Sequence, residues 1–255
     1  MKININKDLN IILELVQRDL KKKYRGSILG IIWTVLNPLL MMIVLTIVFS
    51  NVFRFETGNY PLYLMTGQVL FNFFSEATSL SMMSIIANAS LIKKIYIKKW
   101  LFPLSSVTFS LINTFFSIIA IFLIIFFTGG KIYWSYLLIP VVYLYLFIFS
   151  LGFGLILSAL TVFFRDIMYL YNVFLTILMY LTPIFYPENI IPEQYKNLVS
   201  LNPLIYFLKY FRKIILEGEI PDLKLNIICM SISIVSFITG ILVFKTKENQ
   251  FVLDI

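Results

Sequence analysis

The stretch RDLKKKYRGSILGIIWTVLNP, Arg18 to Pro38, decides the fold of this chain. Its first half is basic and follows a helical pattern, Gly26 interrupts that pattern, and the second half carries no charge. A basic amphipathic helix that lies on a membrane surface and leads into a first membrane span is the simplest physical interpretation. The rest of the chain is expected to fit the orientation set by this junction.

The composition is that of an integral membrane protein. Hydrophobic residues make up 60% of the chain and charged residues 13%, whereas charged residues are about a quarter of a soluble protein. The net charge of +8 does not indicate a nucleic-acid partner, because the basic residues cluster beside apolar segments and follow the positive-inside rule. With no histidine and a single cysteine, Cys229, neither a disulfide framework nor a Cys/His metal site is expected.

The apolar runs predict an all-α membrane protein with six transmembrane helices. Residues 1–25 are expected to form the amphipathic interfacial helix, and residues 26–255 the transmembrane domain. The spans are expected at about 28–53, 61–86, 104–127, 136–164, 167–185 and 225–244, with a polar turn at 54–60. Each run is close to or above the roughly 20 residues that cross a hydrocarbon core of about 30 Å.

The segment 186–224, between the last two spans, is expected to lie on the outer side. It is rich in proline and acidic residues, so it is not one span. Asn202-Pro203 is typical of a helix start and Gly218 of a helix stop. Short re-entrant or interfacial helices are therefore predicted here.

The second span is polar on one side. Its polar residues recur at helical spacing, with one acidic residue beside them: Gln68, Asn72, Ser75, Glu76 and Ser79. An ionised glutamate facing lipid costs roughly 2.5 to 3.5 kcal/mol, so this stripe is expected to face protein or water. These residues are candidates for lining a channel, and hydrogen bonding between helices is the alternative for the neutral ones.

Charged segments on the predicted cytoplasmic side are candidate contact sites. The loop 88–103 carries four lysines within seven positions, and Ser90 is placed to cap a short helix in it. A second charged turn, Arg165-Asp166, lies between the fourth and fifth spans, where its two residues either pair with each other or contact a partner. With six spans, fourteen lysines and arginines fall on the face of both termini and seven on the other, so both termini are expected in the cytoplasm.

Four motifs together resemble the membrane subunit of bacterial ABC-type polysaccharide exporters, the permeases for O-antigen or teichoic acid chains. They are RDLKKKYRGSILGIIWTVLNP, NASLIKKIY in the lysine loop, FFRDI at the second charged turn, and the second LNP at 201–203. The resemblance covers almost the whole chain. Family members often carry a proline and charged residues after the lysine pair, where this chain has Lys98, Lys99 and Trp100.

The resemblance implies a homodimer in the bacterial plasma membrane, with a channel between its subunits and a lipid-linked glycan as substrate. It implies no catalytic residue and no cofactor on this chain, with ATP and Mg²⁺ bound by two copies of a cytoplasmic ATPase. The sequence agrees, since no G-x-x-x-x-G-K-[ST] phosphate loop occurs in it. The residues implied to couple to the ATPase are Lys93, Lys94, Tyr96, Lys98, Lys99, Trp100, Arg165 and Asp166.

The same resemblance places a basic cluster at the substrate entrance: Arg18, Lys21, Lys22, Lys23 and Arg25. Its two candidate partners are anionic membrane lipids and the phosphate of a lipid-linked glycan. The alternatives for the whole chain are a drug or lipid exporter of the same architecture, an ion-coupled secondary transporter, and a membrane scaffold or enzyme. Against the ion-coupled transporter, only Glu76 is an acidic residue well inside a span.

Overall fold

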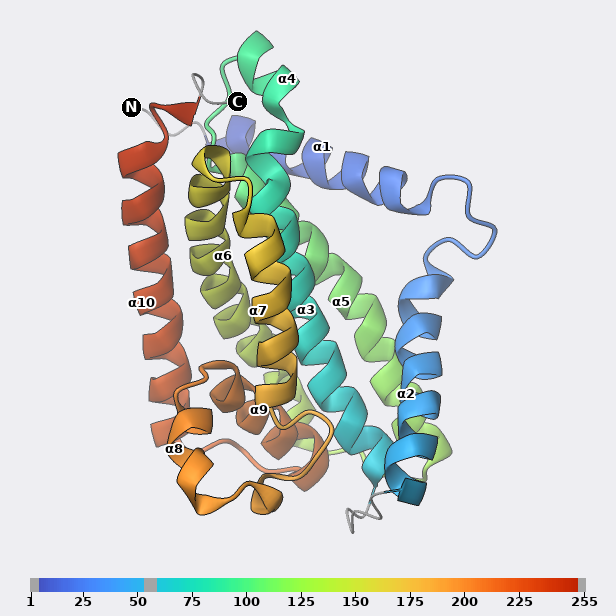
Figure 1. Ribbon diagram of the computed structural model, residues 1–255. Coiled ribbons are helices and arrows are strands. Elements are labelled where there is room, and N and C mark those ends of the chain that lie inside the picture. Colours follow the sequence, from blue (N-terminus) through green and yellow to red (C-terminus); the bar gives the residue numbers. More distant parts are fainter. Residues whose placement is uncertain (1–4, 53–58, 252–255) are drawn as a thin grey trace.

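The computed structural model describes residues 5–52 and 59–251, and within these ranges all regular structure is helical (Figure 1). The elements are α1 Ile5–Tyr24, α2 Ile32–Val52, α3 Tyr60–Ala87, α4 Ala89–Lys94, α5 Leu101–Phe127, η1 Trp134–Leu138, α6 Ile139–Phe163, α7 Ile167–Leu181, η2 Glu188–Ile190, α8 Glu193–Ser200, α9 Leu204–Arg212, η3 Lys213–Glu217 and α10 Leu223–Lys247. Most of the polar turn expected at 54–60 lies outside the described residues.

Among the described residues, five helical segments are long and apolar enough to cross a membrane: α2, α3, α5, η1 with α6, and α10. The prediction of an all-α, multi-span membrane protein is confirmed at this level. Helix α7 is also apolar but has only 15 residues. At 1.5 Å per residue it is about 22 Å long, shorter than a hydrocarbon core of about 30 Å.

The fifth predicted span was expected to continue to residue 185, whereas α7 ends at Leu181. Thr182, the residue before Pro183, is extended, with φ −85° and ψ 130°. A residue that precedes proline is pushed out of the α region by the proline ring, so the helix ends here. The side-chain amide of Asn202 then donates to the Thr182 hydroxyl over 2.8 Å, which joins the end of α7 to the start of α9.

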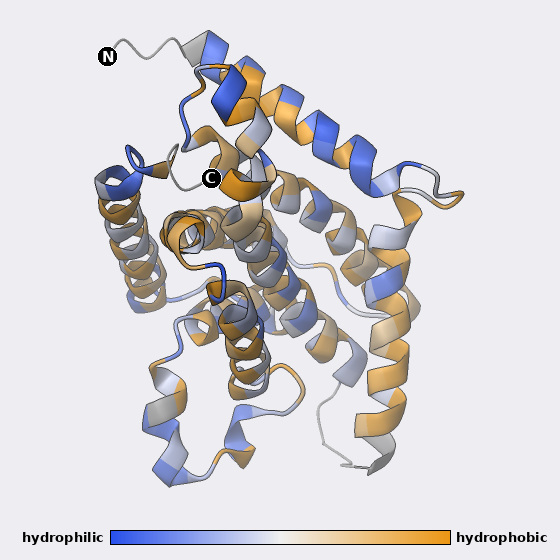
Figure 2. Ribbon diagram, turned by 45° about the horizontal axis from the view of Figure 1, so that its top comes forward, coloured by the Kyte–Doolittle hydropathy of each residue, from blue (hydrophilic) through white to orange (hydrophobic). Residues whose placement is uncertain are grey.

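Helix α1 lies across one end of the bundle (Figure 1). It is amphipathic, and polar and apolar residues alternate along it in Figure 2, while α2 is mostly apolar. The helix ends at Tyr24, and Gly26 follows with φ +79°, a left-handed conformation that favours glycine. The first span then begins at Ile32, four residues later than expected.

Helices α3 and α6 form the centre of the bundle, and α10 packs along α6 (Figure 1). The two backbones of α6 and α10 approach closely at Gly152 and Gly240. A Cβ atom on Gly152 would overlap the carbonyl of Ser236, and one on Gly240 would overlap the carbonyl of Gly152. Small residues at this crossing therefore allow contact that no larger side chain permits.

The two ends of the bundle differ. One end, here the α4 end, carries α1, α4 and the last turns of α10 (Figure 1). The opposite α9 end carries η2, α8, α9 and η3, in the segment where short helices were predicted. Helix α9 begins after Asn202-Pro203, and the helical run ends at Gly218, which has φ +72°. Both the start and the stop read from the sequence are confirmed.

Candidate functional site

A polar groove of about 880 Å³ lies among α2, α3 and α5, and the last residues of α1 also line it. Its lining combines hydroxyl, amide and aromatic side chains with one ion pair: Lys23, Tyr24, Trp33, Thr34, Asn37, Asn72, Ser75, Glu76, Ser79, Asn113, Thr114 and Ser117. Trp33 is 46% exposed. This groove offers hydrogen-bond donors and acceptors within a bundle that is otherwise mainly apolar.

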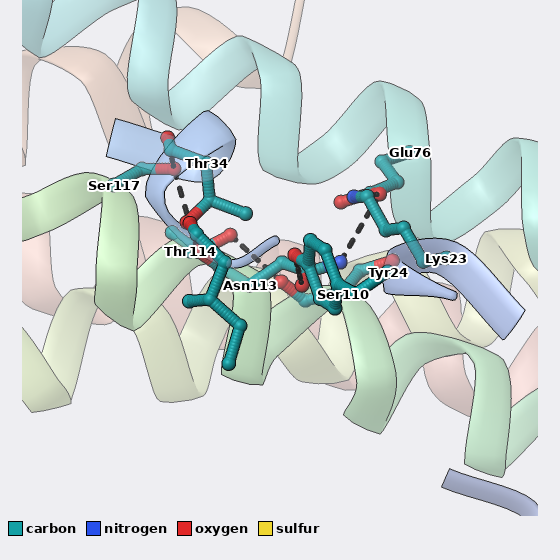
Figure 3. Close-up of polar contacts among 9 residues, drawn as sticks. Lys23, Tyr24, Thr34, Glu76, Ser110, Asn113, Thr114 and Ser117 are labelled. Carbon is teal, nitrogen blue, oxygen red and sulfur yellow. Dashed lines mark hydrogen bonds and ion pairs between the residues drawn. The ribbon is translucent and has the colours of Figure 1, made fainter. Parts of the chain in front are cut away.

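Glu76 is the centre of a polar network in this groove (Figure 3). Its Oε1 lies 2.7 Å from Lys23 Nζ and accepts a hydrogen bond from Asn113 Nδ2 over 3.2 Å. The Tyr24 hydroxyl donates to Asn113 Oδ1 over 2.9 Å. The network therefore joins the end of α1 to α3 and α5, and it satisfies the glutamate that the sequence places inside a span.

The channel-lining candidates of the second span divide into two groups. Asn72, Ser75, Glu76 and Ser79 line the groove. Gln68 does not, and its side-chain oxygen is buried without a hydrogen-bond partner in the described part of the chain. On α3 the groove lining already includes Val69, and its polar residues begin at Asn72.

The basic residues of α1 also divide. Arg18 donates to Asn88 Oδ1 over 2.7 Å, and it forms an ion pair of 2.8 Å with Asp19. Lys23 faces the groove, as described above. The others, Lys21 and Lys22 on α1 and Arg25 just after it, are exposed and line a second pocket, which Arg18 also lines. The basic cluster therefore divides into two residues bonded to α3 or the residue that follows it, Lys23 and Arg18, and three that face outward, Lys21, Lys22 and Arg25.

The lysine-rich loop protrudes at the α4 end (Figure 1). Lys93, Lys94 and Ile95 are exposed, and Tyr96 is 90% exposed. We define residues 93–96 as the loop tip. The cap prediction for Ser90 is wrong, because α4 begins one residue earlier and its N-cap residue is Asn88.

The second lysine pair of the loop lies at its base and is bonded within the chain. Lys98 Nζ bonds the carboxylate of Asp8 in α1, and Lys99 Nζ donates to the backbone carbonyl of Glu248 after α10. Trp100, the N-cap residue of α5, is 37% exposed. The four lysines of the loop therefore do not share one environment.

Arg165 and Asp166 are exposed at the α4 end, in the turn between α6 and α7. Neither forms an ion pair within residues 5–52 and 59–251. Asp166 is the N-cap residue of α7 but makes no side-chain capping bond. The alternative in which Arg165 and Asp166 pair with each other is therefore not observed, and contact with a partner stays a prediction.

Arg212, at the α9 end, was not singled out from the sequence. Its side chain is buried, its guanidinium lies 3.6 Å from the Tyr63 ring centroid, and Nη1 donates to the Tyr63 hydroxyl and the Pro183 carbonyl, each over 2.8 Å. Burial lowers its pKa to about 10, so the guanidinium remains charged at neutral pH. The sequence does carry one signal for this residue. Arg212 follows Ile205 and Leu208 at helical spacing, which places a charged residue on the apolar side of α9.

The structure contains no cluster of three or more potential metal-ligating side chains in its described ranges. The features that remain are a polar groove within the bundle, a protruding loop at the α4 end, and a basic amphipathic helix between them. A polar groove inside a multi-span bundle, with a protruding loop at one end, is the arrangement expected of a transport permease.

Comparison with known proteins gives the family. Residues 11–216 match the ABC-2 type transporter membrane family, so the chain belongs to that family. In such systems the ATPase is a separate protein, and the permease is the membrane subunit.

Individual relatives extend over nearly the whole chain. The chain is 29% identical to an O-antigen export system permease protein RfbA of Klebsiella pneumoniae, over 98% of this chain and 97% of that protein. It is 29% identical to the RfbA protein of Myxococcus xanthus, over 94% of each, and 23% identical to the polysialic acid transport protein KpsM of Escherichia coli, over 92% of each.

Proposed function

We propose that this chain is the channel-forming permease of an ATP-driven exporter of lipid-linked polysaccharide, of the O-antigen or teichoic acid type. The family match and the relatives named for O-antigen export support this class of substrate. The polar groove is the observation within the chain that carries the proposal. A polysaccharide presents many hydroxyl groups, and the amides, hydroxyls and exposed Trp33 ring of the groove match such a surface.

The proposed topology has six spans, with α7 as a short fifth span completed by the extended residues after Leu181. Both termini and the α4 end lie on the cytoplasmic side of the bacterial plasma membrane, and the α9 end lies outside. The excess of lysine and arginine at the α4 end supports this orientation. The α9 segment then forms a re-entrant cover at the outer exit.

The proposed assembly contains two copies of this chain and two copies of a cytoplasmic ATPase, which binds ATP and Mg²⁺. The loop tip, residues 93–96, docks on the ATPase, since it is the part of the loop that protrudes from the bundle. Apolar side chains exposed on α2 and α7, such as Val44, Ile47, Leu170 and Val173, supply surface for the second copy and for lipid.

Two roles follow for the basic residues of α1. The outward residues Lys21, Lys22 and Arg25 bind anionic lipid headgroups, because they are exposed on a helix that lies across the end of the bundle. Lys23 faces the groove, 2.7 Å from Glu76, and is the residue placed to meet the phosphate of an arriving lipid-linked glycan.

The proposal that glycan passes through the groove is tested by placing a cysteine at Asn72, an exposed residue of the groove lining, and measuring how fast it is labelled. The complex of the permease with its ATPase is reconstituted in lipid nanodiscs, with Asn72→Cys as the probe position. We expect a water-soluble maleimide to label Asn72→Cys, and an added lipid-linked glycan to slow the labelling. The native Cys229 is buried and is expected to remain unlabelled.

The matched control is Thr239→Cys on α10, which is exposed on the surface of the bundle at a position outside the groove lining. In the hydrocarbon layer it is expected to react slowly and without any effect of the glycan. Equal labelling at the two positions, or labelling at Asn72→Cys that no lipid-linked glycan changes, would contradict a glycan path through the groove. Stimulation of ATP hydrolysis by a drug or lipid alone would favour the alternative exporter class.

A further inference from the structure

The base of the lysine-rich loop, Lys98 and Lys99, is bonded to α1 at Asp8 and to the end of α10 at the Glu248 carbonyl. We propose that Lys98 and Lys99 are positioning residues, which carry movement of the loop into α1 and α10, and that only the loop tip contacts the ATPase. This inference rests on the proposed function, because it assumes that an ATPase acts on the loop. It assigns the two lysine pairs of the loop to different tasks.

The first contact joins the loop to α1. Lys98 Nζ bonds Asp8 Oδ2, and the two side chains are only 15% and 13% exposed. Asp8 lies in the first turn of α1, where the helix dipole favours a negative charge. A poorly solvated ion pair is sensitive to the loss of either partner, because the remaining charge stays buried. The contact therefore keeps α1 and the loop base in a fixed relation.

The second contact joins the loop to the end of α10. Lys99 Nζ donates to the Glu248 carbonyl and lies 5.6 Å from the centroid of the Phe251 ring. Phe251 is completely buried, with its ring centroid 5.2 Å from that of Phe244 and 6.0 Å from that of Phe163. Phe163 belongs to the end of α6, so Phe251 packs between α6, α10 and the loop.

These contacts divide the loop by geometry. The tip, with Tyr96 90% exposed, offers surface to a partner, whereas the lysines of the base are already bonded within the chain. A force applied at the tip reaches α1 through Lys98 and the α6–α10 pair through Lys99. Helix α1 in turn contacts the groove through the Lys23–Glu76 ion pair, so the loop base and the groove share one rigid element.

The test exchanges the charges of the Asp8–Lys98 pair in the permease–ATPase complex in nanodiscs. Two quantities are measured: the ATPase retained per permease, and the glycan exported per ATP hydrolysed. We expect Asp8→Lys and Lys98→Asp each to retain the ATPase but to lower export per ATP about fivefold or more, the scale of a typical coupling free energy. The double exchange is expected to restore export.

The neutral variants Asp8→Asn and Lys98→Gln keep the side-chain size and cover the case in which a charge reversal prevents folding. They are expected to lower export per ATP with the ATPase retained, as is Phe251→Ala for the second contact. Tyr96→Ala is the opposite control: it is expected to lower the affinity for the ATPase about thirtyfold or more, the loss that defines a contact hot spot.

Loss of the ATPase in the Lys98 variants would show that the loop base is a docking contact and would overturn the proposal. Unchanged export per ATP in all the Asp8, Lys98 and Phe251 variants would overturn it equally. Failure of the proposed function gives a different result, since the unmodified complex would then show no ATP-dependent export of glycan.

Discussion

Single residues in this protein show how charge is accommodated beside a membrane. Glu76 lies inside a span, and it is held by Lys23 and Asn113 at 2.7 and 3.2 Å. Arg212 is held by carbonyl groups and the Tyr63 ring. Both charges therefore have close polar partners, as a charge in a poorly solvated place requires, although Nε of Arg212 is buried without one in the described residues.

Arg212 is expected to be essential for the stability of the α9 end. The variant Arg212→Met keeps much of the side-chain volume but removes the guanidinium donors to the Tyr63 hydroxyl and to two backbone carbonyls, those of Pro183 and Ile184. Within the described residues, the Pro183 carbonyl retains only a longer bond of 3.3 Å from the Tyr63 hydroxyl. Because each buried group left unsatisfied costs about 1 to 3 kcal/mol, the free energy of unfolding should fall by about 3 kcal/mol or more. Thermal unfolding of the purified protein in detergent measures this change.

Lys209 provides the matched control, three residues earlier on the same helix. It is exposed and pairs with Glu188 at 2.8 Å. An exposed ion pair contributes about 0 to 1 kcal/mol, so Lys209→Met should change the unfolding temperature little. Equal losses in the two variants would mean that Arg212 is not the residue that holds α9 in place.

At the scale of elements, proline and glycine decide where helices end and how closely they approach. Pro183 ends α7 after 15 residues, and Gly26 separates the interfacial helix α1 from the first span. Gly152 and Gly240 let α6 and α10 touch backbone to backbone. Proline and glycine at these few positions therefore set where α1 and α7 end and how closely α6 and α10 pack.

The crossing of α6 and α10 is expected to reject any larger side chain. Gly240→Val places its methyl groups against the backbone of Gly152, so the two helices must separate. Overpacking of this kind costs typically about 1 to 3 kcal/mol, and the unfolding temperature should fall accordingly. The control is Ile238→Phe, which enlarges a side chain that is 51% exposed on α10 and should leave the protein stable. A stable Gly240→Val protein would contradict the close crossing.

At the scale of the whole molecule, the bundle has two ends with different chemistry. The α4 end collects the basic helix α1, the lysine loop and the end of α10, whereas the α9 end collects short helices with acidic residues and prolines (Figure 1). This polarity along the bundle is what a permease needs if an ATPase acts at one face and the substrate leaves at the other.

The orientation is tested with reporter fusions at three positions. A reporter after Lys94 is expected to be active in the cytoplasm, and reporters after Lys131 and after Glu193 are expected to be active outside, because lysine and arginine are concentrated at the α4 end. A pair of reporters, one active only inside and one only outside, distinguishes the two faces at each position. A cytoplasmic signal after Glu193 would contradict six spans with α7 as the fifth.

The sequence by itself determined the helices and the general polarity of the protein. The helix start at Asn202-Pro203 and the stop at Gly218 are confirmed, because the backbone preferences of proline and glycine act over a few residues. Of the polar stripe of α3, four residues line the groove and Gln68 does not, and the channel-lining role stays a prediction. The predicted fifth span extends four residues beyond α7, because the ring of Pro183 pushes Thr182 out of the helical conformation.

Only the tertiary structure decided which polar side chains meet. Lys23 and Glu76 are 53 positions apart, Asp8 and Lys98 are 90 apart, and Arg212 and Tyr63 are 149 apart. Such pairs depend on how helices pack, and no local pattern encodes that. The basic residues at the end of α1 and the four lysines of the loop look alike in sequence. The fold separates them, because it brings Lys23, Lys98 and Lys99 against Glu76, Asp8 and the Glu248 carbonyl.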